Sequence, residues 1–171
     1  MGFLFRARPW YFIVAFSCIA LLGYGYYVQH VDFLDPCPLC IFQRVVFMWI
    51  GAVALVAFIH NPGSTGRWTY STLISLGGIA GAIIAGRHTW LQNLPPEEVP
   101  ECGQGLNYML DNMPFSEVLD QVFRGSGECA TIDWTFLGLS MPNWTLIWYT
   151  GITLVTIVVT VRANARQSYG Q

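Results

Sequence analysis

Four long apolar runs constrain this chain more than any other feature of its sequence. They cover residues 10–28, 38–59, 68–86 and 143–161. Three of the runs are 19 residues long and uncharged, and the remaining run contains only Arg44. A helix of that length rises about 28 Å, close to the ~30 Å hydrocarbon core of a bilayer, whereas apolar runs in soluble core helices seldom exceed about 14 residues. The sequence therefore predicts an all-α membrane protein, a four-transmembrane-helix bundle.

The composition supports this class and excludes others. Apolar residues make up 54% of the chain and charged residues 11%, about half the charged share of an ordinary soluble domain. All eight basic residues are arginines, and ten acidic residues outnumber them. A basic surface for nucleic acid is therefore not expected, and the apolar content excludes a disordered chain.

The charged residues divide between the two sides of the predicted bundle. We take the spans as residues 10–28, 41–59, 68–87 and 143–161. Both termini and the 60–67 connection then share one side, which carries Arg6, Arg8, Arg67, Arg162 and Arg166. The opposite side, with loops at about 29–40 and 92–142, holds all ten acidic residues. Because arginine-rich segments stay inside, we expect both termini in the cytoplasm and interpret residues 1–171 as a single integral membrane domain.

The second outer loop contains a pattern of its own. Its apolar residues recur at i, i+3, i+4, i+7 and i+8: Phe115, Val118, Leu119, Val122 and Phe123. This spacing predicts a short amphipathic helix. Its apolar face could lie on the lipid headgroups or pack on the protein, and the sequence leaves both alternatives open.

Five cysteines carry the functional signal. Cys37 and Cys40 form a Cys-Pro-Leu-Cys motif at the outer end of the second span, and Cys102 and Cys129 lie in the second outer loop. Cys18 falls in the middle of the first span, where a buried cysteine is a packing residue. Four outer cysteines allow three disulfide connectivities. Adjacency favours Cys37 with Cys40, which leaves Cys102 with Cys129.

The two predicted disulfides differ in what they can contribute. A ring of 28 residues from Cys102 to Cys129 stabilises a fold by roughly 3.6 kcal/mol, whereas the four-residue ring contributes only about 1.9 kcal/mol. The small ring is therefore a poor structural link. Cys37 and Cys40 are, however, expected at the N-terminus of a helix, a position that favours a reactive thiolate. Structural zinc sites use two close cysteine pairs, and 26 residues separate Cys102 from Cys129, so we expect no metal. The pattern indicates redox chemistry.

Two polar residues accompany the Cys-Pro-Leu-Cys motif. Arg44 follows Cys40 by four residues and therefore shares its helix face, at a depth where an unpaired cation is costly. His88 falls at the outer end of the third span. It is either an ordinary interfacial donor or, with Arg44, part of a pocket that binds a ring carbonyl and stabilises the negative charge it gains on reduction.

Several motifs together resemble the bacterial DsbB family, the disulfide bond formation proteins B. They are Gln29-His30, Cys37-Pro-Leu-Cys40 with Arg44, Arg87-His88-Thr89-Trp90-Leu91-Gln92, Ser126-Gly127-Glu128-Cys129-Ala130, and the segment from Trp134 to Pro142. The match covers most of the chain in order. Motif order favours this family over the vitamin K epoxide reductase type, which is another class of quinone-linked thiol enzyme.

The resemblance implies a protein-dithiol:quinone oxidoreductase of the bacterial inner membrane with catalytic loops in the periplasm. Its partner is a DsbA-like oxidase of thioredoxin fold, which attacks the Cys102–Cys129 disulfide, and Cys37–Cys40 then reoxidises that pair. Electrons pass to ubiquinone or menaquinone from the bilayer, with Arg44 and His88 as quinone-binding residues. The alternative from another class is a structural or assembly protein with static periplasmic disulfides.

Overall fold

A computed structural model describes residues 7–31, 33–34, 36–95, 97–99, 106–124, 127–132 and 134–169. Four long helices dominate it: α1 (Ala7–Val31), α2 (Pro38–His60), α3 (Ser64–Gln92) and α7 (Met141–Tyr169). Each contains one of the apolar runs, and each is long and apolar enough to cross a membrane. The predicted all-α, four-helix membrane fold is thereby confirmed.

The start and end of α2 follow from local chemistry. Cys37 is the N-cap, and its Sγ accepts the backbone N–H of Cys40 at 3.4 Å. Pro38 occupies the first turn, where its missing N–H would have no helical partner in any case. At the other end Asn61 adopts a left-handed conformation (φ 45°), and its N–H bonds to the carbonyl of Ala57 at 3.0 Å. These two caps fix the length of α2.

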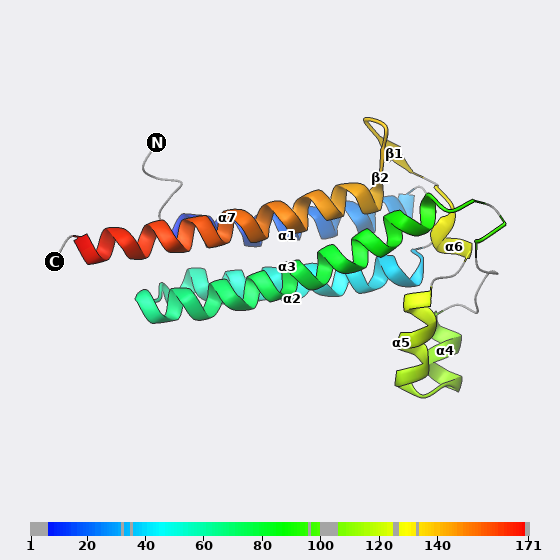
Figure 1. Ribbon diagram of the computed structural model, residues 1–171, viewed down its shortest axis with the longest axis horizontal. Helices are drawn as coiled ribbons and strands as arrows, with labels where there is room; N and C mark the ends of the chain where they lie inside the picture. The colour runs from blue at the N-terminus through cyan, green and yellow to red at the C-terminus, as the bar shows by residue number, and fades with distance from the viewer. Residues whose placement is uncertain are drawn as a thin grey trace.

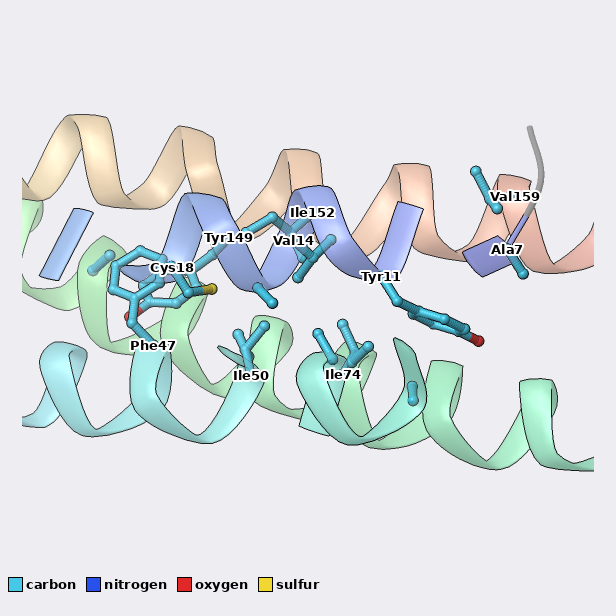
Figure 2. Close-up of a cluster of buried hydrophobic side chains, with 14 residues drawn as sticks. Ala7, Tyr11, Val14, Cys18, Phe47, Ile50, Ile74, Tyr149, Ile152 and Val159 are labelled. Atoms are coloured by element: carbon cyan, nitrogen blue, oxygen red, sulfur yellow. The ribbon is translucent and has the colours of Figure 1, made fainter. Parts of the chain in front are cut away.

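The bundle core lies between the four long helices (Figure 2). Tyr11, Val14 and Cys18 of α1 meet Ile50 of α2 and Ile74 of α3 in one buried cluster. Nearer the starts of α2 and α7, the rings of Phe47 and Tyr149 stack with their centroids 4.2 Å apart.

Glycines on α3 allow α7 to approach closely. A Cβ added at Gly81 would lie 2.5 Å from the Tyr149 ring, whereas one added at Gly86 would meet nothing within 4 Å. Close approach through small residues is the usual way in which membrane helices pack. The glycine at position 81 is therefore required by packing, and the glycine at position 86 is not.

The segment between α3 and α7 gathers at one end of the bundle (Figure 1). It contains α4 (Leu106–Asn112), α5 (Phe115–Arg124), α6 (Gly127–Ala130) and a hairpin of β1 (Thr135–Phe136) and β2 (Leu139–Ser140). Helices α4 and α5 lie side by side next to the end of α2 and project to one side of the bundle, and the hairpin precedes α7. The start of α1, the α2–α3 connection and the end of α7 lie at the other end.

Helix α5 is the amphipathic helix that the sequence predicts. Val118 and Val122 are buried in a second cluster, which we call the outer cluster. Its buried members are Cys37, Leu39, Ile84, Leu91, Met109, Val118, Val122 and Cys129. At these two valines, α5 therefore packs on the protein, one of the two alternatives left open by its sequence. The side chains of Phe115, Leu119 and Phe123 lie outside the described residues.

Candidate functional site

Three sulfur atoms meet in and beside the outer cluster. Cys37 caps α2 and Cys40 lies in its first turn, with their Sγ atoms 3.1 Å apart. Cys129, from α6, approaches the same place: its Sγ, the Sγ of Cys37 and a ring nitrogen of His88 all lie within 4.8 Å of one another. The structure thus brings sulfur atoms from the two predicted outer loops close together, without a bond between them. Cys102 lies outside the described residues, so its predicted pairing with Cys129 stays a prediction.

The position of Cys129 depends on contacts between α6 and its neighbours. Helix α6 packs against α3. Gln92, the last residue of α3, donates its Nε2 to the carbonyl of Thr131 at 3.3 Å, just after α6. The same side chain accepts the hydroxyl of Ser140 in β2 at 2.6 Å. One glutamine therefore links the ends of α3 and α6 to the hairpin and holds Cys129 near Cys37.

His88 lies between a sulfur and an amide. Its Nε2 is 3.7 Å from the Sγ of Cys37, and its Nδ1 is 3.3 Å from the Nε2 of Gln43. Thr145 of α7 lies on the far side of Gln43, with its Oγ1 2.7 Å from the Gln43 Oε1. When Gln43 donates to Nδ1, the ring proton sits on Nε2 and faces Cys37. His88 is then placed to hydrogen-bond a Cys37 thiolate.

Gln43 and Thr145 are site residues that the sequence reasoning missed. A signal was present, because Gln43 is a polar residue in an apolar run, one position before Arg44. It is buried, and its backbone carbonyl also accepts the Tyr149 hydroxyl at 2.7 Å. Buried polar groups in a membrane span mark functional sites more often than packing.

Arg44 is held by three groups of α1. Its Nη1 donates to the Oε1 of Gln29 at 2.5 Å and its Nη2 donates to the carbonyl of Gly25 at 3.1 Å. The guanidinium also lies 5.0 Å from the ring centre of Tyr26, a cation–π contact. The sequence places the Arg44 guanidinium in a membrane span, where an unpaired cation is costly. These contacts with α1 fix its orientation.

A cavity of about 520 Å³ brings these residues together. Cys37, Cys40, Arg44 and His88 all line it. Its other walls are largely apolar and aromatic, from Leu21, Leu22 and Val28 of α1 and from Trp134, Phe136, Trp144 and Trp148 of the hairpin region and α7. Such a cavity fits a flat, mostly apolar ring whose polar substituents meet the arginine and the histidine. Cys37 and Cys40 are part of the same lining, so a ring bound in the cavity would lie near their sulfur atoms.

Comparisons with known proteins agree on one family. A sequence model described as disulfide bond formation protein DsbB matches residues 7–159. The protein named disulfide bond formation protein B of Hahella chejuensis is 47% identical over 91% of this chain and 94% of its own length. Proteins of the same name from Nitrosococcus oceani and Acinetobacter baylyi are 48% and 49% identical, over 86% and 85% of this chain and 87% and 85% of their own lengths.

Proposed function

This chain belongs to the DsbB family of disulfide bond formation proteins, and from that premise we propose that it oxidises a periplasmic DsbA-like protein and passes the electrons to a membrane quinone. Family and fold make it a multi-pass membrane oxidoreductase of disulfide formation. The observation that carries the finer proposal is the meeting of Cys37, Cys40 and Cys129 beside a cavity lined by Arg44. A static disulfide has no need of such a cavity.

The first transfer takes place between proteins. A thiolate of the reduced partner, a thioredoxin-fold oxidase, attacks the Cys102–Cys129 disulfide at Cys102 and releases Cys129 as a thiolate. The second thiol of the partner then displaces Cys102, so the partner leaves with a disulfide and both loop cysteines are reduced. Each step breaks one S–S bond and forms another, and its rate depends on the pKa and access of the sulfurs.

The second transfer takes place inside the protein. The Cys129 thiolate attacks Cys37 of the Cys37–Cys40 disulfide and releases Cys40 as a thiolate. Cys102 then displaces Cys37 from Cys129, which restores the Cys102–Cys129 disulfide. The proximity of Cys129 to Cys37 supports this route, and the Nε2 of His88, 3.7 Å from Cys37, is placed to share its proton.

The last transfer oxidises the Cys37 and Cys40 thiols back to a disulfide. As the Cys37 and Cys40 thiols form a disulfide, their two electrons and two protons would pass to ubiquinone or menaquinone held in the cavity, which would supply the oxidising power and leave as the quinol. The residues of this chain fit that group in size, apolarity and polar contacts: the aromatic walls would bind its ring, and Arg44, held by Gln29 and Gly25, would stabilise negative charge at a ring oxygen. We propose His88 as a second polar contact of the quinone. Cys40 is proposed as the thiolate that delivers electrons to it.

The charge distribution supports an orientation in the bacterial inner membrane. With both termini in the cytoplasm, the loops at about 29–40 and 92–142 face the periplasm and carry all ten acidic residues. The end of the bundle with α4, α5, α6 and the hairpin is then periplasmic, where a soluble thiol partner has access.

Alkylation trapping in membranes tests the proposal. With quinone present, we expect Cys37, Cys40, Cys102 and Cys129 to be oxidised and unmodified, and with quinone depleted we expect reduced, alkylated cysteines. Adding back quinone with a reduced DsbA-like partner should restore oxidation of the partner. Oxidation of the partner at the same rate without quinone would contradict the proposal.

A further inference from the structure

Cys37, His88 and Cys129 form a compact group of soft donor atoms. The three residues are 7%, 3% and 1% exposed, and their donor atoms all lie within 4.8 Å of one another. In a tetrahedral zinc site, metal bonds of about 2.3 Å to sulfur and 2.0 Å to nitrogen place the ligand atoms roughly 3.5 to 3.8 Å apart. The Cys37 Sγ to His88 Nε2 distance is 3.7 Å. One pair of donor atoms is therefore already at the spacing of such a site, and the other two pairs, within 4.8 Å, could reach it through small side-chain movements.

We propose that the fully reduced protein binds one thiophilic divalent cation, Zn²⁺ or its analogue Cd²⁺, on Cys37, Cys129 and His88. This metal site rests on the proposed function in one respect only: the catalytic cycle produces the reduced form of the protein, in which Cys37, Cys40 and Cys129 are thiols. On binding, each of the two thiols releases a proton to water and the imidazole keeps a neutral ring. Two thiolates then cancel the 2+ charge of the metal, which a buried site requires. Thiolate and imidazole ligands favour zinc over magnesium or calcium.

The surroundings complete the coordination shell. The Sγ of Cys40 lies 3.1 Å from that of Cys37, so it can move to the fourth position, which water otherwise fills. The backbone N–H of Cys40 already donates to the Cys37 sulfur at 3.4 Å, which helps to hold that sulfur in place.

The hydrogen bonds around Gln43 also permit the histidine tautomer that a metal needs. For Nε2 to bind a metal, Nδ1 must carry the proton and donate it, which the Oε1 of Gln43 can accept after an amide flip. The flipped Nε2 of Gln43 then faces Thr145, whose hydroxyl can donate to the Pro142 carbonyl 2.9 Å away. Ligating histidines usually have such a partner for the second nitrogen.

The site depends on the redox state of the protein. A disulfide sulfur carries no thiolate charge, so a Cys37 bonded to Cys40 or to Cys129 cannot act as this ligand. The oxidised protein therefore lacks the site. The metal, once bound, holds the protein in its reduced form and blocks the exchange between Cys129 and Cys37.

Cadmium titration tests the proposal without any turnover. Detergent-purified protein is reduced, freed of reductant, and titrated with Cd²⁺ against a chromophoric chelator while thiolate-to-cadmium absorption is recorded. We expect the reduced protein to bind one equivalent of Cd²⁺. The oxidised protein should take no Cd²⁺ from the chelator. Cys129→Ser and His88→Ala should each weaken binding at least about tenfold. Cys18→Ala, which changes a cysteine in the bundle core, should bind as the parent does.

Each remaining outcome decides between explanations. Equal binding by the parent, Cys129→Ser and His88→Ala would overturn the site, and so would binding by the oxidised protein. Loss of binding in Cys102→Ser with retention in His88→Ala would assign the metal to four thiolates instead. Thermal unfolding of each variant identifies one that has merely lost its fold. Quinone-dependent oxidation of the partner in metal-free buffer tests the proposed function separately, so either proposal can fail alone.

Discussion

Two buried cysteine environments in one bundle differ in what surrounds the sulfur. In the bundle core, Cys18 lies among Tyr11, Val14 and Ile50, and its Cβ would be 3.1 Å from a Cβ added at Gly51. In the outer cluster, Cys37 is almost as deeply buried but contacts Cys40 and His88 and lines a cavity. Both cysteines are buried, so burial alone does not separate them. Under the proposed function, the neighbouring donors and the cavity would make Cys37 the reactive sulfur, while Cys18 only packs.

The largest expected effect separates the two environments directly. Cys40→Ser should lower quinone-dependent oxidation of a DsbA-like partner by about 10³-fold or more, because a serine hydroxyl cannot exchange with a disulfide. Cys18→Ala should keep the rate within about twofold, since the sulfur is used for packing. Quinone absorbance in purified protein measures both rates. A Cys40→Ser variant with near-normal turnover would place the reactive sulfur elsewhere.

A smaller effect is expected at the cation of the cavity. Arg44→His should raise the KM for quinone about 10- to 100-fold, the scale of a lost hydrogen bond to a charged group, with little change in the KM for the partner. Gln29→Ala removes one of the contacts that orient Arg44 and should raise the same KM only a few-fold. Steady-state titrations of each substrate give the four values. Equal increases in both KM values would argue against a quinone contact.

The smallest effect concerns the packing that supports the cavity wall. Gly81→Ala forces a methyl group against the Tyr149 ring and should destabilise the protein by about 1–3 kcal/mol. Gly86→Ala, on the same helix, points into open space and should be neutral or slightly stabilising. Thermal unfolding in detergent compares the pair. Equal melting temperatures would show that α3 and α7 can separate without cost.

Most of the fold could be predicted because a bilayer leaves few options. Each of the four apolar runs satisfies its own backbone in lipid by forming a helix, and the four long helices contain those runs. Periodicity also predicted α5. Periodicity did not predict α4, which is seven residues long, or the hairpin. The hairpin turn places Leu137 at φ 52°, a position where glycine or asparagine is the usual sequence signal. Short elements outside the membrane carry too few residues for a period to emerge.

The sequence named the candidate residues of the site, His88 and Cys129 included, but it predicted their arrangement only where they are close in sequence. Cys37, Cys40 and Arg44 follow from spacing on one helix, and all three line the cavity. The approach of Cys129 to Cys37 depends on how α6 packs on α3, which no local spacing encodes. Gln43 and Thr145 are 102 residues apart and become partners only when α7 faces α2 across the bundle. Contacts of that kind belong to the tertiary fold.

The N-cap of α2 carries a consequence for engineering. Serine, aspartate and asparagine are the preferred residues at such a position, so optimising helix caps to make a sturdier protein would select Cys37 for replacement. That change would strengthen the helix and remove a sulfur from the proposed relay. Attempts to improve thermostability should therefore leave this weaker cap in place and begin at the opposite end of the bundle.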